Sequence, residues 1–473
     1  MVEHPYTERL ATELPLRFSA RMRSLSFLQR LVVLVVLGSF GASLWWQRDV
    51  TLSLVMVATQ IGFLILAAFR IVLVIVSRQR SDAPVEDSHP LPVYTILAAL
   101  HDEADIVPQL IRRLAAIDYP QDRLQGMLLI EAHDTPTLTA AESAPRPDWL
   151  EVVIVPPGDP MTKPRALNHD LRLSTGDLLT VYDAEDHPDP GQLREAAARF
   201  SDSPDSRLAC LQAPLRISAP HETSRDSAFL HRQFAVEYAS LFEVTLPGLA
   251  RLGMPFPLGG TSNHFRIDVL RAAGGWDPFN VTEDADLGFR LWRQGWHLGI
   301  MTRPTHEVPP NALKDWLPQR TRWLKGFMQT WGVHTRTLSG LGFAGLVALT
   351  VTIGGTLASA GLHALAVSWL LATVMISLLA GLPPIPPAFA VSVMILGTAA
   401  AWLSGQIGAR RAGVPYSAND MIMSPIYWSL MSLAFAHAVW RLVVEPFTWD
   451  KTPHRPDPVT FDVHCVHAGR QVV

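Results

Sequence analysis

The chain has 473 residues, of which 48% are hydrophobic and 17% charged, and its net charge is −4. This composition is too apolar for an ordinary soluble enzyme and too charged for a bare bundle of membrane helices, so the chain must combine both kinds of structure. The balance of charge gives no sign of nucleic-acid binding, and no nucleic-acid partner is expected. The two cysteines, Cys210 and Cys465, form neither a closely spaced metal pair nor a disulfide framework.

The N-terminal part predicts a cytosolic arm, residues 1–30, and two membrane-spanning helices within residues 31–80. One apolar stretch runs from about Leu31 to Trp46, and a second runs from about Val50 to Val76. Each is close to the roughly 20 residues that cross a bilayer. Arginines flank the pair on both outer sides, at positions 17 to 30 and at 78 and 80. They place the N-terminus and the following segment in the cytosol. A buried core hairpin is the alternative.

The segment 90–310 has the pattern of an α/β domain, because short apolar runs alternate with helical segments. The expected strands are Val93–Leu100, Met127–Glu131, Glu151–Val155 and Leu178–Tyr182, and the expected helices are Asp105–Ala116, Arg165–Leu173 and Gly191–Phe200. This alternation indicates a doubly wound parallel sheet, in which ligands bind beyond the carboxyl ends of the strands. Polar clusters follow the first, second and fourth strands, at residues 101–103, 131–134 and 183–186.

The C-terminal part predicts a second membrane block. Tryptophans and basic residues at helical spacing indicate interfacial helices over 311–335, with Pro318 starting the second one. The block 341–443 predicts four further spans, with a turn near His363: Leu341–Leu362, Ala364–Leu382, Ala388–Ile407 and Met423–Val443. A total of six spans returns the tail, residues 444–473, to the cytosol. The same count places Arg410 and Arg411 outside, against the positive-inside tendency.

An acidic turn ends the fourth predicted strand. Its carboxylates are Asp183, Glu185 and Asp186. Alternate side chains of an extended segment can face one ion, and carboxylate oxygens are ligands for Mg²⁺ or Mn²⁺. A solvated or helix-capping turn is the alternative.

Two more segments carry candidate chemistry. Residues 280–286, Asn-Val-Thr-Glu-Asp-Ala-Asp, open a helix expected at Leu287–Trp292, and a carboxylate there can accept a proton. A capping box with Thr282 as N-cap is the alternative, and both interpretations can hold together. Further on, Gln319 and Arg322 share a helix face beside Trp323. Arginine can fork onto a diphosphate and tryptophan can stack on a sugar, although a membrane-surface helix with snorkelling arginines is the alternative.

Taken in order, these segments resemble family 2 glycosyltransferases of the processive type, the group of bacterial cellulose, curdlan and hyaluronan synthases, and phage-adsorption-type membrane glycosyltransferases. Those enzymes show a DxD-like acidic motif, then Thr-Glu-Asp, then Gln-x-x-Arg-Trp, then membrane helices. The resemblance covers about residues 25–454. Further matches are Asp118-Tyr119-Pro120, Lys163-Pro164-Arg165-Ala166-Leu167-Asn168, Gly259-Gly260-Thr261-Ser262-Asn263 and the tail Trp449-x-Lys451-Thr452-x-His454.

The resemblance implies an α/β fold of the GT-A type, a cytosolic nucleotide-binding domain inserted between transmembrane helices of the bacterial inner membrane. It implies an inverting transfer from a nucleotide sugar, with a UDP-sugar expected, and Asp284 as the base. Donor contacts would be Glu103, Asp134, Lys163, Asp183, Gln319, Arg322 and Trp323. Acceptor contacts would be Gly260, Thr261, Glu283 and Trp323. Mg²⁺ or Mn²⁺ would be held by Asp183, Glu185 and Asp186.

Two departures from the family pattern leave alternatives open. The second strand ends in His133-Asp134 rather than Asp-Asp, so the contact with the nucleotide base could shift to Glu131. The acidic turn reads Asp-Ala-Glu-Asp, so Asp186 could replace Glu185 as a ligand.

Three functions compete as interpretations of this sequence. The first is a processive synthase that makes an extracellular or envelope polysaccharide and threads it through the spans, with other envelope-export subunits as further partners. The polar residues within the spans that could line such a path are His363, Ser404, Gln406 and His437, with interhelical hydrogen bonding as the alternative. The second is transfer of one sugar to a polyprenyl phosphate or another lipid. The third is a non-catalytic membrane component of a surface complex.

Overall fold

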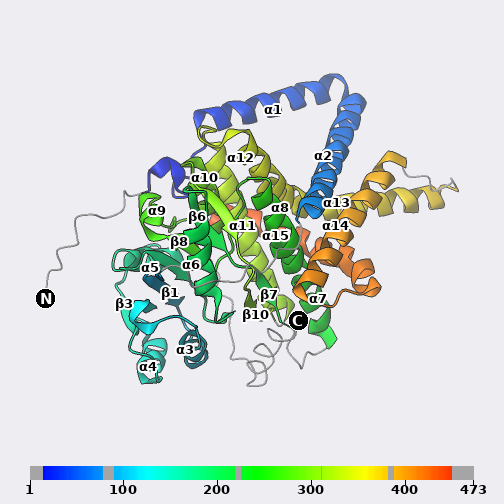
Figure 1. Ribbon diagram of the computed structural model, residues 1–473. Coiled ribbons are helices and arrows are strands. Elements are labelled where there is room, and N and C mark those ends of the chain that lie inside the picture. The colour runs from blue at the N-terminus through cyan, green and yellow to red at the C-terminus, as the bar shows by residue number, and fades with distance from the viewer. Residues whose placement is uncertain (1–13, 78–89, 219–224, 311, 382–387, 450–473) are drawn as a thin grey trace.

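The computed structural model describes residues 14–77, 90–218, 225–310, 312–381 and 388–449, so Arg78, Arg80 and the tail from position 450 lie outside the described residues. An α/β domain occupies one side of the molecule, and long apolar helices project from it (Figure 1). The α/β class expected from the sequence is confirmed.

The larger sheet has seven strands in the order β3-β2-β1-β4-β8-β6-β9. Their bounds are β1 Tyr94–Leu100, β2 Leu124–Glu131, β3 Leu150–Val155, β4 Leu178–Val181, β6 Leu208–Gln212, β8 Asn263–Arg266 and β9 His297–Ile300. The four predicted strands form its parallel half. Strand β8 is antiparallel to both neighbours. Its four residues, Asn-His-Phe-Arg, lack the apolar run by which a buried strand is recognised in sequence.

Strands β1, β2 and β4 are buried on both faces of the larger sheet, as expected of parallel strands covered by helices. In β1, for example, Ile96 and Ala98 belong to one apolar cluster and Leu97 to another. The covering elements of the α/β domain are α3 Val107–Ala115, α4 Thr135–Ser143, α5 Lys163–Leu171, α6 Gln192–Asp202, α7 Arg225–Ser240, α8 Leu246–Arg251, α9 Ile267–Ala272 and α10 Glu283–Arg293, with the short turns η1 Leu16–Phe18, η2 Gln121–Arg123 and η3 Leu241–Thr245. The three helices predicted between the strands correspond to α3, α5 and α6.

A smaller sheet has three strands in the order β5-β10-β7. They are β5 His187–Pro188, β7 Leu215–Ile217 and β10 Thr305–Glu307. Strand β5 follows the acidic turn directly, so this sheet brings β10 beside it.

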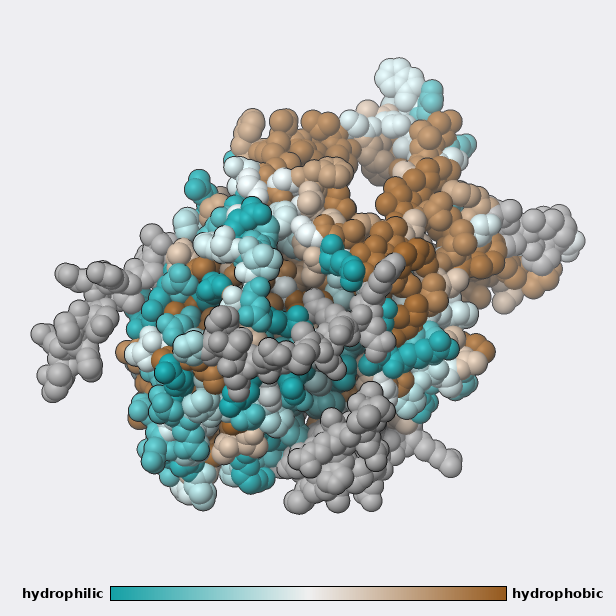
Figure 2. Space-filling model, in the orientation of Figure 1, coloured by the Kyte–Doolittle hydropathy of each residue, from teal (hydrophilic) through white to brown (hydrophobic). Residues whose placement is uncertain are grey.

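Five helices in the described residues are long and apolar enough to cross a membrane. They are α1 Phe27–Trp46, α2 Arg48–Val76, a continuous helix built from α12 Gly342–Leu349, η4 Thr350–Gly354 and α13 Gly355–Leu379, then α14 Ala388–Ala412 and α15 Ala418–Val444. Hydrophobic surface gathers on the side from which these helices project, whereas the α/β domain is largely hydrophilic (Figure 2). These features are those of a membrane protein.

Two expectations about helices were wrong. No turn occurs at His363, which lies inside the single 38-residue helix Gly342–Leu379, so the described residues contain five candidate spans rather than six. The π-helical turn η4 interrupts the regular α-helical hydrogen bonding without ending the helix. Pro318 likewise starts no second helix. It lies within α11, Leu313–Thr335, near the N-terminus, where the loss of one backbone donor is tolerated.

Helix α15 is fastened to the α/β side of the molecule at both ends. Near its start, Arg232 of α7 forms an ion pair with Asp420 (2.6 Å). Just past its end, Lys325 of α11 donates hydrogen bonds to the carbonyl oxygens of Glu445 (3.1 Å) and Thr448 (2.7 Å). Between these points α15 packs along α11 (Figure 1). A helix tied in this way at both ends follows the domain surface.

Candidate active site

The acidic turn after β4 is ordered by its third carboxylate. Asp186 is fully buried, and its Oδ2 accepts hydrogen bonds from the backbone N–H of Asp183 (2.7 Å) and from the hydroxyl of Thr261. Asp183 is more open, and Lys163 forms an ion pair with only one of its oxygens. The turn therefore presents Asp183 outward and keeps Asp186 beneath it.

Lys163 links the acidic turn to the glycine loop before β8. It is the first residue of α5, and its Nζ donates both to Asp183 and to the carbonyl of Gly260 (2.7 Å). Burial alone would lower the pKa of Lys163, but Asp183 and Glu283 outweigh burial and raise it, so the ammonium stays charged. A Cβ on Gly260 would lie 3.3 Å from Oδ2 of Asp284. The glycine therefore lets the loop approach that carboxylate.

Two carboxylates open helix α10. Burial raises the pKa of Glu283 to about 7, with the charge of Asp284 adding to the effect. Burial also raises the pKa of Asp284 to about 6, against the opposing effects of the Ala285 N–H, Lys163 and Arg322. Thr282 is the N-cap of α10, as the alternative interpretation had it, but it makes no side-chain cap hydrogen bond, so no capping box forms. Its hydroxyl faces Asn280 (3.4 Å). Asp284 is therefore a carboxylate poised to exchange a proton near neutral pH.

Helix α11 brings the Gln-x-x-Arg-Trp motif close to Glu283 and Asp284. Oε1 of Gln319 and Nε of Arg322 are buried and have no hydrogen-bond partner in the part of the chain that the structure describes. Buried polar atoms normally find a partner, so these two atoms suit a polar ligand. The ring of Trp449 lies 4.6 Å from the guanidinium carbon of Arg322. Sequence reasoning placed Trp449 only in the tail, and no local pattern signals this contact.

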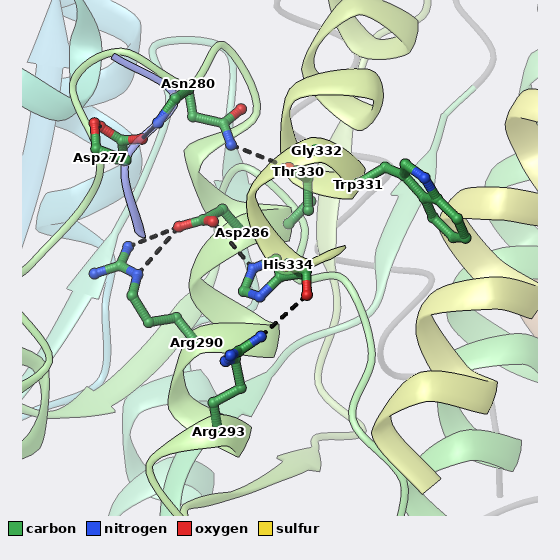
Figure 3. Close-up of polar contacts among 12 residues, drawn as sticks. Asp277, Asn280, Asp286, Arg290, Arg293, Thr330, Trp331, Gly332 and His334 are labelled. Atoms are coloured by element: carbon green, nitrogen blue, oxygen red, sulfur yellow. Dashed lines mark hydrogen bonds and ion pairs between the residues drawn. The ribbon is translucent and has the colours of Figure 1, made fainter. Parts of the chain in front are cut away.

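A buried polar cluster ties α10 to α11 (Figure 3). Oδ2 of Asp286 accepts from Arg290 (3.1 Å), and Oδ1 accepts from Nε2 of His334 (3.1 Å). Burial would raise the pKa of Asp286, but Arg290 and His334 outweigh it and hold the pKa low. Asn280 donates to the hydroxyl of Thr330 in the same interface (3.0 Å). Through this cluster, the helix that begins with Asp284 is positioned against the helix that carries Arg322.

The residues expected at the nucleotide end lie beyond β1 and β2. Asp134 is the N-cap of α4, accepting from the N–H of Thr137 (3.2 Å), and it also accepts from the N–H of Asp102 (2.6 Å). Burial would raise the pKa of Asp134, but these hydrogen bonds lower it overall. Glu131, the alternative contact for the nucleotide base, already forms an ion pair with Arg165 (2.5 Å). Glu103 is buried, and its N–H donates to the hydroxyl of Thr137 (2.9 Å).

In the described residues, only the cluster of His101, Asp102 and Asp134 brings three candidate metal-ligand atoms within 4.8 Å of one another. The acidic turn forms no such closed group. It does gain a carboxylate that sequence reasoning missed, Glu307 of β10. Burial raises the pKa of Glu307 well above its usual value, and the charges of Asp186, Glu185 and Asp183 raise it further. Nothing in the short strand Thr-His-Glu signals this placement.

About half of the chain is similar to known proteins. The family model described as glycosyl transferase family group 2 matches residues 178–404. A probable glycosyltransferase, YdaM, of Bacillus subtilis is 25% identical over 244 residues, 51% of this chain and 56% of the relative. A β-monoglucosyldiacylglycerol synthase of Synechocystis is 25% identical over 51% of this chain and 49% of the relative. The UDP-forming cellulose synthase 1 catalytic subunit of Komagataeibacter xylinus is 26% identical over 53% and 33%.

The chain spans about half the length of the first two relatives and 33% of the length of the third. Among solved structures, a mannosyltransferase of Pyrobaculum calidifontis in complex with GDP-Man and Mn²⁺ superimposes with a TM-score of 0.46 at 16% identity, covering 81% of this chain and 99% of that one.

Proposed function

We propose that this chain, in which residues 178–404 match the model of glycosyl transferase family group 2, is a glycosyltransferase that moves a sugar from a nucleotide-sugar donor, with a UDP-sugar expected, onto an acceptor held at the membrane surface. The observation that carries the proposal is the convergence of Lys163, Asp183, Gly260 and Asp284. It joins a cationic group, a partly exposed carboxylate and a proton acceptor in one place.

In the proposed reaction, Asp284 takes the proton from the acceptor hydroxyl. The acceptor oxygen then bonds to the anomeric carbon as the bond to the nucleotide diphosphate breaks, and the diphosphate leaves with that bond's electrons. Attack from the side opposite the leaving group inverts the anomeric configuration. Lys163 and Arg322 hold the diphosphate oxygens as negative charge develops on them.

The acidic turn fits a divalent cation. Burial, Asp183 and Glu185 raise the pKa of Asp186 well above its usual value, so negative charge is crowded there. Oδ1 of Asp186 is buried without a hydrogen-bond partner in the described chain. Asp183, Glu185 and Asp186 would hold Mg²⁺ or Mn²⁺, which would neutralise charge on the departing diphosphate.

The arrangement of the helices supports a cytosolic position for the α/β domain. With both ends of α15 tied to α7 and α11, we place α15 along the membrane surface rather than across it. Four crossings then remain, made by α1, α2, α12–α13 and α14. With the domain in the cytosol of a bacterial inner membrane, Arg410 and Arg411 also lie on the cytosolic side, in agreement with the positive-inside tendency.

Two acceptor classes are compatible with the site. A growing envelope polysaccharide is the first. The second, a single sugar added to a lipid, is favoured by the polar side chains of the long helices. Ser404 bonds to Ser240 (2.7 Å), His437 to Thr321 (3.0 Å) and His363 to the carbonyl of Pro425 (3.3 Å). These groups hold helices together, as the alternative interpretation expected, and so provide less support for a polar channel.

The test is incubation of the full chain in lipid nanodiscs with a panel of radiolabelled nucleotide sugars, followed by sizing of the product. A polymer supports the first class, and a one-sugar lipid product supports the second. Asp284→Asn keeps the shape of the side chain but cannot take a proton, so transfer should fall by about 10²–10⁴-fold. Labelled product formed at the wild-type rate by Asp284→Asn would refute the proposed base.

A further inference from the structure

Arg320 stands between Gln319 and Arg322 in the motif, yet its surroundings are entirely different. It is only 2% exposed. Its guanidinium carbon lies 4.5 Å from the ring centre of Trp323, 4.6 Å from that of Phe234 and 5.6 Å from that of Trp316. A guanidinium within about 6 Å of an aromatic face is attracted by the ring, so Arg320 is the centre of a stack rather than a surface cation.

The same guanidinium is held by a closed ring of hydrogen bonds. Nη1 of Arg320 donates to Oε1 of Glu237 in α7 (2.7 Å), and Nη2 donates to the hydroxyl of Tyr427 in α15 (3.0 Å). The Tyr427 hydroxyl in turn donates to Oε2 of Glu237 (2.6 Å). Three helices far apart in the sequence thus meet at one ion pair, in which Arg320 is buried and Glu237 is partly exposed. Charge-assisted bonds of this kind are strong and directional.

The contacts of Arg320 restrict the orientation of the Trp323 indole. Its indole packs against Arg320 and lies beside the rings of Phe234 (6.2 Å) and Tyr238 (6.1 Å). The indole cannot turn without disturbing the guanidinium, and the guanidinium cannot move without breaking bonds to Glu237 and Tyr427. The orientation of the indole therefore depends on a residue of α15.

We infer that Arg320, Glu237 and Tyr427 are positioning residues, which hold the indole of Trp323 in the orientation that receives the acceptor sugar. This inference rests on the proposed function and on the acceptor contact that the family resemblance implies for Trp323. It gives α15 an indirect part in the acceptor site, through the bonds of Tyr427 to Arg320 and Glu237.

A purely structural role is the competing explanation, because the same ring also fastens α15 to the domain. The two explanations differ in what a small change would do. Tyr427→Phe keeps the aromatic ring against Trp316 but removes the hydroxyl that joins Arg320 to Glu237. If the ring of bonds positions the indole, acceptor KM should rise about three- to tenfold, while kcat at saturating acceptor falls less than twofold.

The matched control is Tyr416→Phe. Tyr416 precedes α15, its ring lies against Gly405 of α14, and it takes no part in the stack. The same deletion of a hydroxyl should leave acceptor KM unchanged there. Arg320→Lys keeps the positive charge but lacks the planar fork, so it should raise acceptor KM at least as much as Tyr427→Phe.

A double-mutant cycle tests whether the effect passes through Trp323. In a Trp323→Ala chain, adding Tyr427→Phe should leave acceptor KM where Trp323→Ala already put it, because the oriented group is gone. Additive effects would overturn the inference. A lower melting temperature for Tyr427→Phe with unchanged acceptor KM would overturn it too, because only the structural role would then remain.

A binding measurement separates this inference from the proposed function. Equilibrium dialysis of the full chain in nanodiscs would use radiolabelled cellotetraose and a short-chain glucosyl diacylglycerol, without donor. Binding weakened about three- to tenfold by Tyr427→Phe, in a chain that transfers no sugar, would sustain the inference and sink the proposed function. Transfer with unaltered acceptor KM in Tyr427→Phe would sink the inference alone. A wild type that binds neither glycoside and transfers nothing would refute both.

Discussion

Gly326 of α11 lies directly against Thr282, the residue before the two carboxylates that open α10. A Cβ added to Gly326 would meet the Thr282 hydroxyl oxygen at 2.3 Å and its Cβ at 2.8 Å. Gly326 is about one helical turn beyond Arg322, so the motif helix packs tightly against the Thr-Glu-Asp segment just past the motif. The distance between the proposed base and the proposed diphosphate-binding arginine depends on this contact.

Gly326→Ala should therefore push the two helices apart. Overpacking of this kind costs about 1–3 kcal/mol of unfolding free energy, and a shift of about 1 Å in a reacting geometry can lower a rate about a hundredfold. Sugar transfer by the purified variant, measured with its melting temperature, checks this. Gly332→Ala, in the same helix, is the control, because a Cβ at Gly332 would meet nothing within 4 Å. Equal activities of the two variants would contradict the prediction.

The pH dependence of transfer should report Asp284. Burial raises the pKa of Asp284 to about 6, and only the ionised carboxylate can take the acceptor proton. As the pH falls through about 6, kcat/KM should decrease, approaching a tenfold loss per pH unit, and it should level off above that value. A profile for kcat/KM between pH 4.5 and 8, at constant metal concentration, gives the answer. A flat profile down to pH 4.5 in a folded chain would exclude Asp284 as the base.

Removal of divalent metal should abolish transfer, and Asp183 should be responsible for much of the dependence. Asp183→Asn removes one charge from the acidic turn while keeping the side chain's size, so most turnover should be lost although the protein still folds. Activity is measured with EDTA, then with Mg²⁺ or Mn²⁺ restored. Asp268→Asn, at an exposed position of α9, is the control and should behave as wild type. Full turnover in EDTA, or by Asp183→Asn, would refute the metal site.

Both ends of α15 should be reachable from the same face of the membrane as the catalytic domain. Single cysteines at Gly413 and Glu445 flank the helix, and one at Gln47 lies between α1 and α2. In inside-out vesicles, a membrane-impermeant maleimide should label the first two and spare the third, after Cys210 and Cys465 are replaced by serine. Labelling of Gly413→Cys and Glu445→Cys from opposite faces would show that α15 crosses the bilayer.

Local patterns predicted those elements whose cause is local. Three of the four predicted parallel strands, β1, β2 and β4, are recognisable because a strand buried on both faces needs a continuous apolar run, as in Tyr94–Leu100. Antiparallel β8 and the short β10 are not, because a polar segment of three or four residues forms a strand only when neighbouring strands pair with it. The turn expected at His363 failed for a related reason. A polar residue suggests a helix end, but Pro425 and Trp428 of α15 accommodate the imidazole within the packed helices.

The sequence by itself determined that the chain joins an α/β domain to long apolar helices, because apolar runs and their alternation are local features. Asp183, Asp284 and Arg322 stood out in short local segments, whereas Lys163 was a candidate only through the family resemblance. Tertiary structure alone decided that Asp186 is buried beneath its turn, that Glu307 joins the acidic group, that Trp449 covers Arg322 and that Tyr427 reaches Arg320. Tyr427 and Arg320 are 107 positions apart. No local pattern records such a pairing, because it depends on how whole helices pack, and packing is set by the shape and burial of many side chains together.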